Sequence, residues 1–138
     1  MEALWSRFLP SYQFVFDQIH KGVIGDVYHV NASLGAVIAN VDRLAKKELG
    51  GGTVLDLGVY TINIVEQVFN GETPEKIKAV GHLNKNGVDF DASVALQFKG
   101  EKTATISTHS LVQLPNEAII VGSKGIIRVI IFFPFYNL

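Results

Sequence analysis

The chain has 138 residues, a length typical of a single domain. Lys and Arg number 12 and Asp and Glu number 13, so the net charge of −1 provides no general positive field for nucleic acid. The sequence contains no cysteine, which excludes disulfides, thiolate nucleophiles and cysteine-ligated metal sites. A reducing, cytoplasmic location is consistent with this composition.

The sequence carries no pattern for secretion or membrane insertion. Residues 1–7 lack the cationic region and apolar stretch of a signal peptide. The longest apolar run, residues 129–133, is followed by Pro134 and is far shorter than the roughly 20 residues that cross a bilayer. Charged residues make up only 18% and the mean hydropathy is +0.26, so part of the apolar surface is expected to meet a partner.

The first helix is expected over Ser11 to Lys21. Pro10 blocks a helix upstream, Ser11 can serve as the N-cap, and Gly22 can take the left-handed closing position. Four apolar residues fall at positions i, i+3, i+4 and i+7 and form one stripe: Tyr12, Val15, Phe16 and Ile19. This stripe predicts that one side of the helix packs against the rest of the domain.

A glycine run, Gly50 to Gly52, separates two further helical segments. A short helix opened by residues 40–42 is expected to end at Lys47, and a longer one is expected over Thr53 to Phe69, stopped by residues 70–71. Gly58 lies inside the longer helix at a cost of about 1 kcal/mol relative to alanine. It is therefore expected to mark close packing or the approach of a ligand.

Alternation of apolar and polar residues begins near Lys76 and predicts strands. The expected strands are residues 77–83, 92–98, 103–110, 117–121 and 126–131, preceded by one at residues 27–33. Residues 99–102 and 122–125 carry hairpin turn signals. Helices first and strands afterwards indicate an α+β fold, an open and mostly antiparallel sheet with helices packed on one face.

Two of the expected strands carry short or hydroxylated side chains on one face. These residues are Ser93, Ala95, Gln97, Thr103, Thr105, Ser107 and His109. Such a face suits either contact with water or the docking of a second sheet, and the pattern alone leaves both alternatives open.

Asp56 and Tyr60 are the candidate catalytic pair. They lie four residues apart on the expected long helix and therefore point from one face. A carboxylate in the first turn interacts favourably with the helix dipole. A phenol exchanges protons near neutral pH only when a nearby cation stabilises its anionic form. The alternative is a helix-terminal carboxylate beside a tyrosine of the core.

Two other features could contact a ligand. The run Gly50 to Gly52 could present backbone N–H groups to an anion, but it matches neither a P-loop nor a dinucleotide fingerprint, and a flexible turn is the simpler interpretation. Trp5 and Arg7 offer an aromatic plate and a cation for a flat or anionic ligand, unless Trp5 belongs to the core. The four histidines lack metal-ligand spacing and are expected to be surface or hydrogen-bonded residues: His20, His29, His82 and His109.

Several segments occur together in one order. They are residues 1–10, Gly25-Asp26-Val27, the stretch Leu49-Gly50-Gly51-Gly52-Thr53-Val54-Leu55-Asp56-Leu57-Gly58-Val59-Tyr60, and Gly122-Ser123-Lys124-Gly125. In this order the sequence resembles the C-terminal domain of the Gfo/Idh/MocA oxidoreductases. The resemblance runs from Met1 to about Ile130, and the segment from the glycine run to Tyr60 is its most specific part.

The resemblance implies a Rossmann domain followed by the α+β domain. Residues 1–138 would form a substrate-binding and dimerisation domain, truncated at both ends and without the dinucleotide-binding domain. The resemblance further implies NADP(H)-dependent oxidation or reduction of alcohol and carbonyl groups by a homodimer that associates through the open sheet face. The implied small-molecule substrates are trans-dihydrodiols of aromatic hydrocarbons, pentoses and dicarbonyl compounds.

The resemblance also assigns roles to single residues. Tyr60 matches the acid/base and Asp56 its neighbouring carboxylate, whereas Trp5 and Arg7 match positions lining the nicotinamide and substrate pocket. Relatives similar to inositol dehydrogenase have a histidine at the place of Tyr60. The family's Glu-Lys-Pro motif, whose lysine would activate the tyrosine, and its glycine-rich strand–turn–helix are absent from this sequence. The chain alone is therefore expected to be inactive and to bind NADP weakly.

Two alternatives of other classes stay open. The chain could be a catalytically inactive fragment that survives as a sheet-mediated association module, with the apolar segment of residues 130–135 adding to its association. It could also be a small binding module that uses Trp5 and the glycine run.

Overall fold

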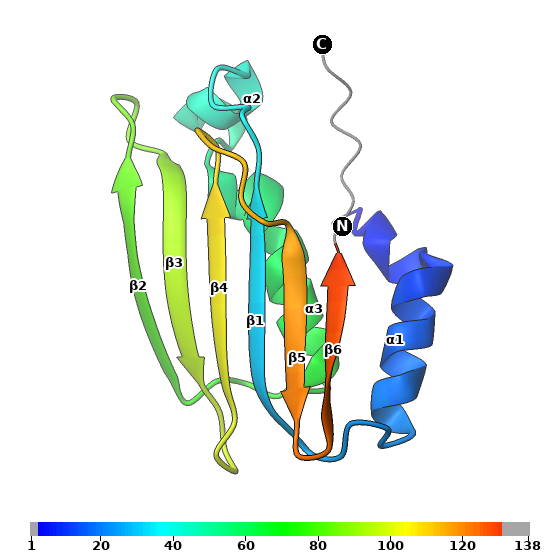
Figure 1. The fold of residues 1–138 in the computed structure, drawn as a ribbon. Coiled ribbons are helices and arrows are strands. Elements are labelled where there is room, and N and C mark those ends of the chain that lie inside the picture. The colour runs from blue at the N-terminus through cyan, green and yellow to red at the C-terminus, as the bar shows by residue number, and fades with distance from the viewer. Residues whose placement is uncertain (1–2, 131–138) are drawn as a thin grey trace.

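The computed structural model describes residues 3–130, which form a six-stranded sheet (Figure 1). The strands are β1 (Val27–Gly35), β2 (Lys76–Leu83), β3 (Asp89–Gln97), β4 (Thr103–His109), β5 (Glu117–Gly122) and β6 (Gly125–Ile130). Their order across the sheet is β2-β3-β4-β1-β5-β6. Strands β1 and β4 run parallel, and the other neighbouring pairs are antiparallel. The expected α+β fold with a mostly antiparallel sheet is confirmed.

The helical segments leave one face of the sheet open. In Figure 1, α3 crosses behind the middle of the sheet, α1 lies beside β6, and α2 lies beyond the end of β1. The segments are η1 (Trp5–Phe8), α1 (Pro10–His20), α2 (Asp42–Ala45), η2 (Lys47–Leu49), η3 (Val54–Gly58) and α3 (Val59–Val68). Within residues 3–130, no helix has the length and apolar character that crossing a membrane requires.

Helix α1 begins one residue earlier than the sequence predicts. Pro10 occupies the first turn instead of preceding the helix, and the hydroxyl of Ser11 makes no capping hydrogen bond. A proline is tolerated there because the first turn leaves its backbone N–H without an intrahelical acceptor. Gly22 has a φ of 70° beyond the end of α1, in the left-handed region as expected.

The expected helix over residues 53–69 consists of two pieces. A π-helical turn, η3, occupies Val54–Gly58, and the α-helix α3 follows over Val59–Val68. A π turn contains more residues than an α turn, so Asp56 and Tyr60 do not have the relative directions of a regular i, i+4 pair. Gly58 is buried, and a Cβ added to it would lie 3.5 Å from the Thr108 methyl group of β4. A methyl group at residue 58 would thus make ordinary van der Waals contact with the sheet, and the packing there does not itself require glycine.

The covered face of the sheet forms the core. Val30, Leu34 and Ile120 are fully buried there, and Ile64 of α3 packs in the same cluster. Burying one such side chain stabilises a fold by about 1.5–3 kcal/mol. The alternation predicted for β3 and β4 is confirmed, because Ile106 faces this core while its neighbour Thr105 faces the open side.

The predicted turns and strand ends agree closely with the structure. The turn at residues 99–102 joins β3 to β4, and Gly100 and Glu101 both have positive φ. The turn at residues 122–125 joins β5 to β6. Residue 131 of the last expected strand, and the apolar segment from residue 131 to 135, lie outside the described residues.

Candidate active site at the start of helix α3

The indole of Trp5 binds the phenol of Tyr60. The Trp5 Nε1–H group donates a hydrogen bond of 3.0 Å to the Tyr60 hydroxyl oxygen, and the two rings meet edge to face with centroids 6.1 Å apart. Trp5, the single tryptophan of the sequence, is 43% exposed, and Tyr60 is half-buried. Two of the sequence-predicted site residues, 55 positions apart, therefore meet at the surface of the domain.

The carboxylate of Asp56 is held by a cation that the sequence analysis did not single out. Arg43 of α2 donates from Nε to Asp56 Oδ1 at 3.1 Å and from Nη2 to Oδ2 at 3.3 Å. Such two-pronged pairing fixes the orientation of a carboxylate as well as neutralising it. The signal was weak, because Arg43 lies 13 residues before Asp56 in a segment whose fold the pattern left poorly defined.

Arg7, two residues after Trp5 in η1, contacts a different residue of α3. Its guanidinium lies 3.9 Å from the Glu66 carboxylate of α3, and both side chains are about half exposed. Arg7, His20 and Glu66 line a hollow of about 310 Å³ between η1, α1 and the end of α3. An exposed ion pair of this length contributes little to stability, so the guanidinium is available to other anions.

The glycine run does not offer free N–H groups to an anion. The N–H groups of Gly50, Gly51 and Gly52 donate to the backbone carbonyls of Lys47, Lys46 and Leu44, respectively. The compact turn explains the glycines, since a Cβ at Gly51 would lie 2.6 Å from two of these carbonyl oxygens. The anion-binding interpretation of the run is therefore wrong, and its residues shape a tight turn.

A carboxylate of the protein itself occupies the start of the helical segment. Asp89 Oδ2 accepts the Val54 N–H at 2.7 Å, and Asp89 also packs on Gly52, whose φ is 121°. A carboxylate at this place satisfies a free N–H and complements the helix dipole. Asp89 thus plays the part that the sequence suggested for Asp56, which leaves Asp56 free to pair with Arg43.

Two buried polar residues lie close to Trp5 and Tyr60 along the sequence. Ser6 follows Trp5, and Asn63 lies one turn after Tyr60; both are almost fully buried. Neither the Ser6 hydroxyl nor either end of the Asn63 amide has a hydrogen-bond partner among the described residues. The Tyr12 hydroxyl of α1 is in the same condition, and burial raises the pKa of Tyr12 to about 12.

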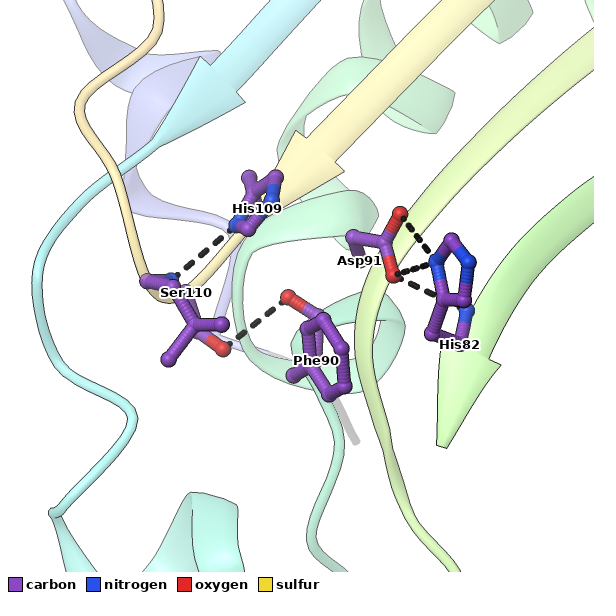
Figure 2. A network of polar contacts seen from close by, with 6 residues as sticks. His82, Phe90, Asp91, His109 and Ser110 are labelled. Atoms are coloured by element: carbon purple, nitrogen blue, oxygen red, sulfur yellow. Dashed lines mark hydrogen bonds and ion pairs between the residues drawn. The ribbon is translucent and has the colours of Figure 1, made fainter. Parts of the chain in front are cut away.

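The prediction that the histidines are surface or hydrogen-bonded residues is confirmed, and one of them forms a pair that the sequence spacing did not indicate. Strand pairing sets His82 of β2 opposite Asp91 of β3, and His82 Nδ1 lies 3.0 and 3.2 Å from the two Asp91 oxygens. Figure 2 shows this pair at the strand ends, with Phe90 between it and His109. His109 Nδ1 accepts the Leu111 N–H at 3.1 Å. No group of three metal-ligating side chains occurs within residues 3–130.

Comparison with protein families identifies the domain type. The family model described as "GFO/IDH/MocA C-terminal domain" matches residues 12–128. Trans-1,2-dihydrobenzene-1,2-diol dehydrogenase of Xenopus tropicalis is 45% identical over 129 residues, which are 94% of this chain and 39% of that protein. The human protein of the same name is 35% identical over 130 residues, again 94% and 39%. The chain thus spans about two-fifths of the length of these curated relatives.

Solved structures have the same fold. An aldose-aldose oxidoreductase from Caulobacter crescentus, complexed with glycerol, superposes with a TM-score of 0.80 at 25% identity, covering 91% of this chain and 39% of that one. GenD2 from gentamicin A biosynthesis, in complex with NAD, superposes with a TM-score of 0.77 at 16% identity, covering 89% and 37%. The second likeness concerns the fold alone.

Proposed function

Because this chain belongs to the GFO/IDH/MocA family of oxidoreductases, we propose that it is the substrate-binding and dimerisation domain of an NADP-dependent oxidoreductase. The proposed reaction interconverts alcohol and carbonyl groups. The proposed substrates are trans-dihydrodiols, in keeping with the names of the curated relatives, together with pentoses and dicarbonyl compounds. The observation that carries the proposal is the contact between Trp5 and Tyr60 at an exposed edge of the helical layer.

Tyr60 is the proposed acid/base. In oxidation its phenol oxygen takes the proton of the substrate hydroxyl, and in reduction the phenol returns a proton to the carbonyl oxygen. The indole N–H of Trp5 points at this oxygen and stabilises negative charge on it. Trp5 also fixes the ring, so the phenol oxygen keeps one position relative to the substrate.

Asp56, four residues before Tyr60 in the chain, and Arg43 are proposed to act as a unit. Arg43 orients the Asp56 carboxylate through two hydrogen bonds. A fixed carboxylate can accept a hydrogen bond from a second hydroxyl of a diol or sugar. The pair would therefore orient the substrate, while the proton moves at Tyr60.

Trp5 and Arg7 fit part of the cofactor. The exposed indole face of Trp5 is a flat apolar surface that suits stacking with a nicotinamide ring, and Arg7 suits an anionic group. When bound, NADP supplies or accepts the hydride. The N–H groups of the glycine run are all used by backbone carbonyls, so that turn is not proposed to hold the phosphates. This chain alone is accordingly expected to bind NADP(H) weakly and to show no turnover.

The test is Tyr60→Phe in the oxidoreductase that contains this domain together with its dinucleotide-binding domain. The rate of substrate oxidation should fall by about two to four decades, while the affinity for NADP should stay nearly unchanged. Tyr28→Phe, at a tyrosine exposed on β1, is the matched control and should retain the rate. Full turnover by Tyr60→Phe would remove this residue from the mechanism.

A second function is supported by a separate observation. The open sheet face carries short side chains across β3 and β4, which allow close approach of another sheet, and it lacks a covering helix. We propose that the domain forms a homodimer through this face, a function that would survive in a catalytically inactive fragment. Thr105→Arg should weaken the dimer by bringing like charges together near a two-fold axis. Sedimentation that shows an unchanged dimer would exclude this face.

A further inference from the structure

The connection between β2 and β3 lies against the segment that carries Arg43. It runs from Asn84 to Asp89, and we call these residues the brace. In Figure 1 the turn between β2 and β3 lies at the same end of the sheet as α2. The contacts between the brace and α2 join residues 39 and 41 positions apart, so no local pattern in the sequence indicates them.

Two side-chain amides of the brace bind one backbone carbonyl of α2. Asn86 Nδ2 donates to the Ala45 carbonyl oxygen at 2.7 Å, and Asn84 Nδ2 donates to the same oxygen at 3.2 Å. Ala45 is the last residue of α2, where a helix leaves carbonyl groups without intrahelical partners. The two asparagines therefore hold α2 at its end.

Helix α2 needs support from outside because it is a single turn. It has 4 residues and no side-chain cap, and helices this short are marginal in water. Its end is also tied through Leu44 and Lys46, whose carbonyls accept N–H groups of the glycine run. A hollow of about 250 Å³ between α2 and the brace is lined by Leu44 and Phe90, among others, so close packing alone does not set the distance between the two segments.

The brace is itself a well-defined turn. Asn84 Oδ1 accepts the N–H groups of Asn86 and Val88 at 2.8 and 3.3 Å, and the Asn84 N–H donates to the Val88 carbonyl at 2.8 Å. Gly87 provides the left-handed residue that the turn contains, with a φ of 75°. The Asn86 amide thus reaches α2 from a backbone that is fixed by its own hydrogen bonds.

The same brace also holds the segment that carries Asp56. Asp89 Oδ2 accepts the N–H of Val54, the first residue of η3, and Asp56 lies within η3. The side chains of Arg43 and Asp56 are 60% and 25% exposed, and an exposed ion pair adds little stability of its own. The geometry of the pair therefore depends on the backbones of α2 and η3, and the brace contacts both.

We infer that Asn84 and Asn86 are positioning residues for Asp56. They fix the end of α2, so that Arg43 holds the Asp56 carboxylate in one orientation. The inference rests on the proposed function, in which this carboxylate binds a second hydroxyl of the substrate, and it identifies the part of the fold that sets its direction. Asn84 and Asn86 act through α2 and do not touch the substrate.

Asn86 is the residue to change, because its amide donates only to α2, whereas Asn84 also shapes the turn. Asn86→Ala removes the donor. Asn86→Asp keeps the shape of the side chain but turns an acceptor toward the Ala45 carbonyl. Lys85→Ala is the matched control, since Lys85 lies between the two asparagines and forms no side-chain hydrogen bond or ion pair with the residues that the structure describes.

The first measurement is made by NMR on this chain. The sequence has 3 arginines, so ¹⁵N-labelled protein gives few guanidinium Nε–H signals, and the signal that disappears in Arg43→Lys belongs to Arg43. In both Asn86 variants this N–H should exchange with water at least about threefold faster, because its hydrogen bond to Asp56 opens more often. Lys85→Ala should leave the rate unchanged. The Trp5 indole signal should stay in place in every variant, which shows that the fold is kept.

The second measurement uses the oxidoreductase that contains this domain together with its dinucleotide-binding domain. The substrate is trans-1,2-dihydrobenzene-1,2-diol, the compound in the names of the curated relatives. Asn86→Asp should raise KM about tenfold, the effect of weakening one hydrogen bond to a charged group. It should change kcat little, because the proton still moves at Tyr60. Lys85→Ala should keep both constants.

Three results would overturn the inference. An exchange rate of Arg43 that is unchanged in both Asn86 variants would show that α2 keeps its place without the amide. Equal acceleration in Lys85→Ala would show that the effect is not specific to Asn86. Faster exchange with an unchanged KM would show that the brace holds α2 without positioning the substrate. If Tyr60→Phe fails to slow the reaction, the proposed function is contradicted while the exchange rates still stand, so the two failures are distinguishable.

Discussion

The two faces of the sheet come from the same six strands but are completed in different ways. On the covered face, Val30, Leu34 and Ile120 are buried by α1 and α3 within the chain itself. On the open face, Ile126 and Ile130 stay more than half exposed, and a hollow remains over β3 and β4. A strand presents alternate residues to opposite sides, so one sequence can specify a buried core on one face and an exposed surface on the other.

The largest contrast between the faces is expected at two neighbouring residues of β5. Ile120→Ala removes a fully buried side chain and should lower the free energy of unfolding by about 2–5 kcal/mol. Ile119→Ala, one position earlier and on the open face, should cost less than about 1 kcal/mol. Urea denaturation of both variants at a concentration where the chain is monomeric measures the difference. Equal losses would show that the open face is packed within the monomer.

The next effect concerns the covered side near the candidate active site. Asp89→Ala removes the carboxylate that accepts the Val54 N–H, so it should lower the free energy of unfolding by about 1–2 kcal/mol. Asp89→Asn keeps an acceptor and should recover part of that loss. Thermal unfolding of the two variants is the measurement. An alanine variant as stable as the parent would mean that the start of η3 does not depend on this cap.

A smaller gain in stability is expected at a buried polar residue. Asn63 is only 4% exposed, and its amide has no hydrogen-bond partner among the described residues. Replacing it by leucine should stabilise the chain by about 1 kcal/mol, because the unmet cost of burying the amide disappears. Asn116→Leu is the contrast, since the Asn116 side chain accepts the Gly35 N–H and its loss should destabilise. Denaturant midpoints that fall for both variants would contradict this account of Asn63.

The smallest effect is a pH dependence at the edge of the helical layer. The hydrogen bond from the Lys102 ammonium lowers the pKa of the Glu72 carboxyl below its usual value. The stability that this carboxylate contributes is therefore present above its unfolded-state pKa and is lost as pH falls through the lower folded-state pKa. Glu72→Gln should remove that part of the acid sensitivity, whereas Glu75→Gln, at an exposed neighbour, should not. Identical acid unfolding of parent and Glu72→Gln would contradict the assignment.

The sequence predicted the elements of the fold well and the connections less well. Periodicity located the strands to within about three residues, because alternation is strong where one face is buried. The parallel pairing of β1 with β4 was not predicted, since it joins segments about 70 residues apart and leaves no local pattern. The π turn at the start of α3 was missed for a related reason. The N–H of its first residue, Val54, is bound by the Asp89 carboxylate of β3, a contact that sequence spacing does not show.

The roles assigned to the candidate site residues stay predictions, and the partners that the structure gives these residues could not be predicted from the sequence. The resemblance identified Trp5, Asp56 and Tyr60, yet the sequence alone did not suggest that Trp5 donates its N–H to Tyr60 or that Arg43 binds Asp56. These contacts depend on how η1 and α2 fold back on α3. The glycine run was expected to be a turn, and its local backbone hydrogen bonds are consistent with that expectation.

The most direct test of the account is the NMR signal of the single indole N–H group. The chain has one tryptophan, so ¹⁵N-labelled protein gives one indole cross-peak, and that proton lies in the hydrogen bond to Tyr60. In Tyr60→Phe the indole proton should move upfield and exchange faster with water, because its acceptor is gone. Tyr28→Phe should leave the peak in place. An indole signal unchanged by Tyr60→Phe would contradict the contact on which the proposed active site is built.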